Sequence, residues 1–235
     1  MKKAVSAIHV AKDRLVPYAA ALSLEAASSE IMNLFHVGKL LDVTLLDNYY
    51  IQLGGKGLCF KESKLLLAVS TGFAIPRLLP LFSNFNNAFS SILMLLKIKK
   101  ILSAKLLNHH SISVALRAGL AGTAAFANYD LRCKELLSNE KEGRILFKVS
   151  GTDIAIWFSF SQNDLCRVDS GVMDYEPTAV FTFLSLKVAR DAVSGWFDHL
   201  GGPALGEAKI SGNLPLLDKI GYISRIAQKA IPSII

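Results

Sequence analysis

After Gly143 the sequence alternates between apolar and other residues with a period of two, and this pattern limits the possible fold more than any other feature. It fills two neighbouring stretches, residues 144–149 and 154–160. Because successive side chains of a β-strand point to opposite faces, each stretch predicts a strand with one apolar face. The link SGTD at residues 150–153 suits a tight turn between them. The residues on the apolar face are Ile145, Phe147, Val149, Ile154, Ile156, Phe158 and Phe160.

The residues that follow predict the rest of a sheet. Residues 165–169 form a third strand, and residues 178–184 form a fourth, with Ala179, Phe181 and Phe183 on one face. The short stretch 208–211 lies between glycine-rich segments. A strand that short stabilises little alone, so it must close a sheet that the other strands build.

Helices are predicted on both sides of this last strand. Ser185 can cap a helix over residues 186–200, and a final helix begins after Asn213. The final helix carries its apolar residues at helical spacing, so one face can lie across the sheet. These residues are Leu216, Ile220, Ile223, Ala227 and Ala230.

The first half of the chain is predicted to be mainly helical. Helical spacing of apolar residues predicts helices over residues 18–36, 85–97 and 112–137, and a small hairpin is expected within residues 49–61. The predicted fold class is therefore α+β, a five-stranded sheet covered by helices with a mainly helical N-terminal region. We expect two regions, residues 1–110 and residues 111–235.

One of these helices raises a separate question. Over residues 85–97 the apolar residues form one face, whereas lysines and leucines mix around the helix beyond Lys97. That mixture fits either an amphipathic helix lying on a surface or a helix packed on two sides. The residues of the predicted apolar face are Phe85, Ala88, Phe89, Ile92, Leu93 and Leu96.

Charge is unevenly distributed along the chain. The net charge is +7, and no acidic residue occurs between Glu62 and Asp130. A basic, apolar and acid-free segment is attracted to anionic membranes, so residues 63–129 are a candidate membrane-contacting surface. The alternative is an ordinary helical segment whose few charges are lysines. Nucleic acid fits less well, because leucine and isoleucine separate the basic residues.

Cysteine spacing, apolar runs and motifs limit the expected cellular compartment and the expected chemistry of the protein. Three separated cysteines without a pairing pattern indicate reduced thiols and a cytoplasmic protein, with no zinc site. No uncharged apolar run is long enough to predict a membrane span. No motif marks a catalytic centre, a metal site or a cofactor, and Asp198 and His199 alone suggest a hydrolase. We expect a protein that is not an enzyme.

The order TAVFTFLSLKVARDAVSG, then GEAKISGN, then an apolar helix resembles the sterol carrier protein family, also called the sterol-binding domain. The preceding NYD and ELLSNEKEGRILFKV resemble it too, so the likeness covers about residues 112–230. Two residues differ from the family's pattern. Thr178 stands where an acidic residue is expected before the fourth strand, and Asn213 stands where the family often has aspartate. The resemblance implies a non-enzymatic carrier that holds a lipid, sterol, fatty acyl chain or isoprenoid in a tunnel between sheet and helices.

The candidate ligand-binding residues lie on the apolar faces of these elements. Trp196 and Phe197, beside the glycines at 201, 202 and 206, are the expected mouth of the tunnel. A large apolar side chain gains about 1.5–3 kcal/mol by leaving water whether its neighbour is protein or ligand, so both a filled core and a lined pocket remain open. The candidates are Phe147, Phe158, Phe160, Phe181, Phe183, Val193, Trp196, Phe197, Ile220 and Ile223.

Three functions remain open from the sequence. The first is binding, transfer or presentation of an apolar ligand by a cytoplasmic protein, peripheral on a membrane and capable of forming a homodimer. The second is an interaction module with a filled core in a lipid-modifying complex. The third is hydrolysis of a lipophilic ester through His199.

Overall fold

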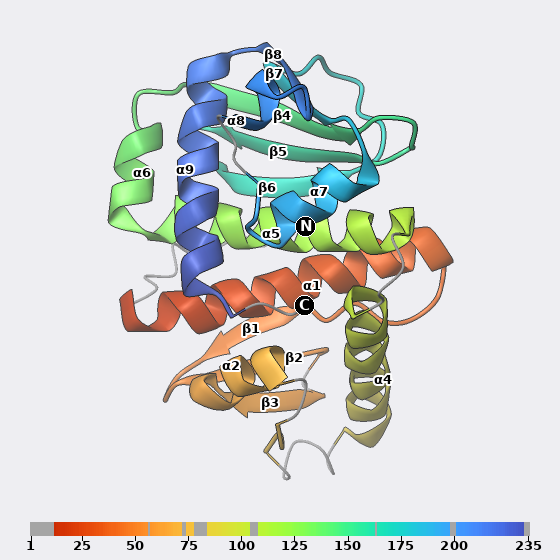
Figure 1. Cartoon of the computed structure of the whole chain (residues 1–235). Coiled ribbons are helices and arrows are strands. Elements are labelled where there is room, and N and C mark those ends of the chain that lie inside the picture. Colours follow the sequence, from red (N-terminus) through yellow and green to blue (C-terminus); the bar gives the residue numbers. More distant parts are fainter. Residues whose placement is uncertain are drawn as a thin grey trace.

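The computed structural model describes residues 12–55, 57–71, 74–77, 84–103, 108–162, 164–197 and 201–232. Two long helices, α1 (Leu15–Phe35) and α5 (His109–Tyr129), lie side by side across the middle of the molecule (Figure 1). A five-stranded sheet with its helices lies on one side of this pair, and a three-stranded sheet with further helices lies on the other. The α+β class predicted from the sequence is confirmed.

The larger sheet has the strand order β6-β5-β4-β7-β8. Strands β4 and β7 are parallel, and the other neighbours are antiparallel. All five strands match stretches that the sequence predicts, and the short last strand lies at an edge. The strands are β4 (Glu142–Val149), β5 (Ala155–Ser161), β6 (Asp164–Ser170), β7 (Ala179–Phe183) and β8 (Ala208–Gly212).

Short polar side chains set the ends of the covering helices. Ser185 accepts a hydrogen bond from the backbone N–H of Val188 and starts α7 (Leu186–Val193), while Asn213 accepts one from Leu216 and starts α9 (Leu214–Ala230). Helix α7 is shorter than predicted. It ends at Val193 because Gly195 adopts a positive φ of 78°, a conformation that suits glycine and turns the chain away.

The single helix predicted over residues 112–137 is two helices. Asp130 has extended backbone angles, and its carboxylate accepts a hydrogen bond from the N–H of Cys133, so α6 (Leu131–Leu137) begins anew after α5. Asp130 thus ends one helix and caps the next. Apolar spacing continues across the break, which is why the pattern alone predicts one helix.

The N-terminal region contains a small sheet that the sequence predicts only in part. The expected hairpin is β2 (Tyr50–Leu53) and β3 (Leu58–Lys61), and β1 (Val43–Leu46) pairs with β2 as a third strand. Helix α2 (Glu62–Thr71) follows without a linker. Four-residue strands carry too little periodicity to be distinguished from a loop.

Helix α4 (Phe85–Leu102) packs on the same side as the small sheet, but with a different face from the predicted one. Its buried residues are Ala88, Ser91, Met94, Ile98 and Leu102. Of the predicted apolar face only Ala88 is buried, and Phe85, Phe89, Leu93 and Leu96 are exposed. None of the helices in the described ranges is both long and apolar enough to cross a membrane.

A buried ion pair joins the two central helices. Arg117 Nη1 on α5 lies 2.8 Å from Glu30 Oε2 on α1, and the side chains are only 10% and 4% exposed. Ser113 donates to the other carboxylate oxygen of Glu30, and Arg117 also donates to Ser170 Oγ on β6 at 3.0 Å. The Glu30 carboxylate therefore ties α1 to α5, and the Arg117 guanidinium ties α5 to the edge of the large sheet.

Close packing brings the same two helices together. Alanine and serine make up half of the buried residues of α1, including Ala19, Ala20 and Ala27, and small residues line α5. A Cβ placed on Gly122 of α5 would come within 3.1 Å of Ser23 Oγ on α1 and within 2.8 Å of Ile231 Cδ1. The small residues are therefore used for contact between helices, which lets the two hydrophobic cores meet at α1 and α5.

Removing one partner of the buried pair should be costly. We expect Glu30→Ala to lower the free energy of unfolding by about 3–5 kcal/mol, because Arg117 would be left charged and uncompensated in the interior. Chemical denaturation measures this loss. Glu142→Ala is the control, since Glu142 and Arg144 form an exposed pair, 55% and 37% exposed, whose loss should change stability by at most about 1 kcal/mol. Equal losses in the two variants would contradict the prediction.

Glu25 on α1 gives the fold a pH dependence of its own. Burial raises the pKa of this carboxyl to about 7, against a hydrogen bond from the backbone of Val43 that lowers it, and Asp42 raises it further. The folded state therefore holds the proton more tightly than the unfolded state. This contribution to stability is complete below the unfolded pKa of 4.5 and is lost as pH rises through about 7.

We expect Glu25→Gln to flatten the decline of the melting temperature between pH 5 and pH 8, because glutamine does not titrate. Melting curves at half-unit pH steps measure the slope. Glu135→Gln, at an exposed position of α6, should keep the wild-type slope. A Glu25→Gln profile that parallels the wild type would show that Glu25 does not titrate in this range.

Candidate functional site

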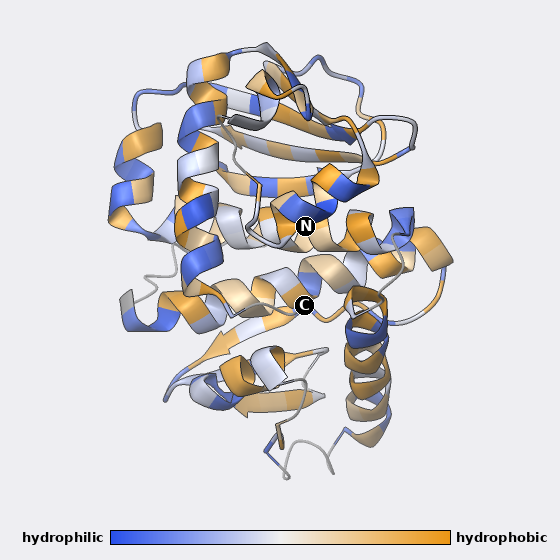
Figure 2. Cartoon of the chain, in the orientation of Figure 1, coloured by the Kyte–Doolittle hydropathy of each residue, from blue (hydrophilic) through white to orange (hydrophobic). Residues whose placement is uncertain are grey.

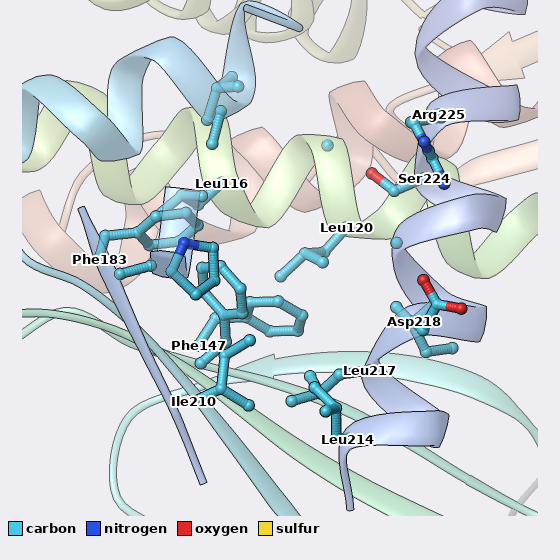
Figure 3. Close-up of a pocket in the computed structure, with 18 of the residues that line it drawn as sticks. Leu116, Leu120, Phe147, Phe183, Ile210, Leu214, Leu217, Asp218, Ser224 and Arg225 are labelled. Carbon is cyan, nitrogen blue, oxygen red and sulfur yellow. The ribbon is translucent and has the colours of Figure 1, made fainter. Parts of the chain in front are cut away.

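A cavity of about 640 Å³ lies between α5, α9 and the inner face of the large sheet. Figure 3 shows its apolar floor, with Phe147, Phe183 and Ile210 from the strands facing Leu116 and Leu120 from α5. Helix α9 forms the remaining long wall (Figure 3). The lining residues are Leu116, Gly119, Leu120, Phe147, Phe181, Phe183, Ala192, Val193, Pro203, Ala208, Ile210, Ser211, Gly212, Leu214, Leu217, Asp218, Ile220, Gly221, Ser224, Arg225 and Gln228.

Aromatic rings on β4 and β7 form the floor. The ring centroids of Phe147 and Phe181 lie 6.1 Å apart, and those of Phe181 and Phe183 lie 4.9 Å apart. Phe197 stacks edge-on against Phe181 and Phe183 at 6.1 and 6.0 Å. Such tilted and edge-on contacts are the favoured arrangement of aromatic pairs, so the rings fix one another in place.

A glycine makes room for Phe197. A Cβ on Gly202, in α8 (Gly201–Ala204), would come within 2.2 Å of Phe197 Cζ. The short helix can therefore lie flat against the ring only because Gly202 has no side chain. This close approach explains one of the glycines that the sequence assigns to a mobile entrance.

The side of the cavity formed by α9 carries both apolar residues, Leu214, Leu217 and Ile220, and a group of polar ones. Of the polar residues, Asp218 lies about two turns before the adjacent pair Ser224 and Arg225, as Figure 3 shows, and Gln228 follows this pair by about one turn. Asp218 and Arg225 are exposed, so the cavity opens to solvent along this edge. Gln228 also donates to the backbone carbonyl of Ala192 at 3.1 Å, which ties α9 to α7. The cavity thus combines an apolar floor with a charged rim.

A second cavity of about 370 Å³ adjoins the first. The two share Gly119, Val193, Arg225 and Gln228 as lining residues. The second cavity extends to Leu102 at the end of α4 and to Ser23 on α1. Gly119 faces open space, since a Cβ built there would meet no atom within 4 Å.

The structure divides the sequence-predicted ligand residues into two groups. Phe147, Phe181, Phe183, Val193 and Ile220 line the main cavity, and Phe197 lines the second one. Phe158, Phe160 and Ile223 line neither and are buried in the core. Phe158 and Phe160 lie on β5, beyond the strands that form the floor. Binding of a ligand by the first group stays a prediction.

Trp196, which the sequence places at the expected mouth, lies apart from both cavities. It is 86% exposed and lines neither cavity. The reason is local, because α7 ends at Val193 and the positive φ of Gly195 directs Trp196 off the helix face that carries Val193. Phe197, the next residue, turns back onto the sheet.

Sequence reasoning missed several lining residues. None of its candidates lies on α5, whereas Gly119 and two leucines of α5 line the main cavity. The signal was present, since Leu116 and Leu120 are one turn apart with Gly119 between them. The polar residues of α9 could not be chosen in advance, because only packing decides which edge of α9 borders the cavity.

The described residues offer little reactive chemistry. Burial raises the pKa of Cys133 and of Cys166 to about 12, so both stay protonated thiols at neutral pH. No group of three histidine, cysteine or acidic side chains within the described part of the chain could hold a metal ion. Asp198 and His199, which suggest a hydrolase, lie outside the described residues.

No family model matches the chain, and no curated protein matches it. Among solved structures, the sterol carrier protein domain 2 of Helicoverpa armigera is 23% identical, with a TM-score of 0.34, over 46% of this chain and 82% of that one. Sterol carrier protein 2 like 2 from Aedes aegypti is 15% identical, with a TM-score of 0.33, over 47% and 97%. The sec-alkylsulfatase Pisa1 from Pseudomonas sp. is 11% identical, with a TM-score of 0.31, over 61% of this chain but 28% of its own.

The contact between Gly202 and Phe197 can be tested directly. We expect Gly202→Ala to lower stability by about 1–3 kcal/mol, because the added methyl group forces Phe197 off Phe181 and Phe183. The double variant with Gly202→Ala and Phe197→Leu should lose less stability than the sum of the losses in the two single variants, as measured by urea denaturation. Gly119→Ala is the matched control and should stabilise by about 0.5–1 kcal/mol, since it adds a methyl group to a helix where space is open. Additive losses would mean that Gly202 and Phe197 do not interact.

Proposed function

We propose that this chain binds an amphiphilic lipid, with the apolar chain in the main cavity and the polar head at the α9 rim. The observation that carries the proposal is a cavity of about 640 Å³ whose floor is made of phenylalanine, leucine and isoleucine side chains. Ligand pockets commonly measure about 300–1,000 Å³ and are lined mostly by apolar residues with a few polar groups, as this one is.

The energetics favour a chain-like guest. Water cannot recover its hydrogen bonds against an apolar wall, so such cavities accept apolar molecules. Each methylene that leaves water gains about 0.8 kcal/mol, and a chain of about ten methylenes gains about 8 kcal/mol. The entropy cost of immobilising the ligand reduces this free-energy gain. The net affinity is then low enough for reversible binding, as transfer or presentation requires.

The polar rim gives the ligand an orientation. Arg225 and Asp218 are exposed at the open edge, and Ser224 and Gln228 lie beside them on α9. A polar head placed there stays in contact with water while its chain reaches Phe147 and Phe183. The arrangement therefore suits a molecule with one polar end better than a wholly apolar one.

The proposal is for a binding protein that is not an enzyme. An interaction module with a filled core, the alternative from the sequence, requires that side chains occupy the space that the main cavity leaves open. The cavity volume favours the binding function over that alternative. A cytoplasmic location, with peripheral attachment to a membrane, belongs to the same proposal.

A blocked cavity tests the proposal. We expect the full chain to bind cis-parinaric acid, a fluorescent fatty acid, and Gly119→Phe to weaken this binding at least tenfold, because the ring projects into the space that Gly119 leaves open. Fluorescence titration measures the affinity, and native mass spectrometry measures the bound mass.

Lys134→Phe is the matched control, since it adds the same ring to an exposed position of α6, away from both cavities. It should bind as the wild type does, and both variants should melt cooperatively. Equal affinity of the Gly119→Phe and wild-type proteins would place the ligand elsewhere. Failure of the wild type to bind any fatty acid or sterol probe would favour the interaction module.

A further inference from the structure

Helix α4 presents a row of large apolar side chains to solvent. Phe85, Phe89, Leu93 and Leu96 recur at helical spacing, so they share one face, and they are 62%, 54%, 51% and 56% exposed. The rings of Phe85 and Phe89 are stacked, with centroids 6.2 Å apart. We call these four residues the α4 stripe. Figure 2 shows how strongly hydrophobic residues dominate α4, at the edge of the molecule opposite the large sheet.

The α4 stripe lies on the side of the helix that faces away from the N-terminal core. The opposite face of α4, with Ala88, Met94 and Ile98, is already packed in the N-terminal core. A contiguous exposed apolar row of this kind marks an interaction surface. Among the residues that the structure describes, the helix is therefore packed on one side and exposed on the other.

Positive charge lies at the end of the same row. Lys99 and Lys100 are exposed one turn after Leu96, and no ion pair of theirs is found within the described residues. Lys97 holds its ammonium 4.8 Å from the centroid of the Phe35 ring. No acidic residue occurs in residues 63–129 to offset these lysines. The surface around the stripe is thus both apolar and positive.

We propose that the α4 stripe docks on an anionic lipid bilayer, with the phenylalanines and leucines entering the headgroup region and the lysines contacting the anionic headgroups. A bilayer supplies an apolar layer and negative charge at adjacent depths, which matches the two parts of this surface. A second copy of the chain would bring the same lysines and no acid from this segment, so its charge is not complementary.

The position of α4 connects the docking surface with the cavities. Leu102, the last residue of α4, lines the second cavity, which shares Gly119, Val193, Arg225 and Gln228 with the main cavity. A bilayer held at α4 would therefore lie near the second cavity, which adjoins the main one. This link rests on the proposed lipid binding, whereas docking itself rests on the stripe and its charge.

Sedimentation with phospholipid vesicles tests the docking. We expect the full chain to bind vesicles of phosphatidylcholine with about 30% phosphatidylglycerol, whose anionic headgroups attract the lysines, and to bind pure phosphatidylcholine at least tenfold more weakly. Leu93→Ser should reduce binding to the anionic vesicles at least tenfold. Lys99→Glu combined with Lys100→Glu should remove the preference for anionic vesicles and its decline with salt.

Leu131→Ser is the matched control, because Leu131 is a 76% exposed leucine on α6, remote from α4 in the fold. It should bind vesicles as the wild type does. Equal vesicle binding by Leu93→Ser and Leu131→Ser, or no binding by the wild type, would overturn the proposal. A dimer in solution that Leu93→Ser dissociates, without vesicle binding, would overturn it in favour of an interface between copies.

Binding of cis-parinaric acid without vesicles separates docking from cavity function. Leu93→Ser should retain wild-type affinity for this probe, because the stripe lines neither cavity. A wild type that binds vesicles but not the probe would leave docking standing and refute the cavity proposal. A wild type that binds the probe but not vesicles would leave the cavity proposal standing and refute docking.

Discussion

The contact between α1 and α5 is the constraint on which the rest of the structure depends. Both helices contribute buried side chains to the core around the large sheet and to the core around the small sheet. Alanines and Gly122 let the helices approach closely, and the buried pair of Glu30 and Arg117 fixes their relative position. Because a buried charge left without its partner is strongly destabilising, an alignment of the two helices that separates this pair would be disfavoured.

The same contact leaves the main cavity open. Helix α5 is held against α1, and α9 is held by its cap at Asn213 and by the bond from Gln228 to Ala192. Neither helix is then free to collapse onto β7 and β8, and Gly119 supplies no side chain at the point where they diverge. The cavity therefore results from a fixed framework of helices and a missing side chain, and the aromatic floor is left facing space.

The sequence predicts the large sheet well, because alternation with a period of two marks a sheet with one buried face. Its predictions were least accurate where one residue changes the chain direction. Asp130 divides a predicted helix, and Gly195 ends α7 early and places Trp196 in solvent. The sequence also left open whether the apolar face of α4 is buried or lies at the surface, since such a face indicates contact with something apolar but does not say with what, and the structure leaves most of it exposed.

By itself, the sequence determined the strands, their apolar face and the caps of the helices that cover them, because these follow from local spacing and from single side chains such as Ser185 and Asn213. Only the tertiary structure decided which phenylalanines border open space and which are core. Burying a ring gains about the same free energy against protein as against a guest, so the sequence pattern is identical in both cases. The difference arises from how far apart distant helices are held, which no local pattern encodes.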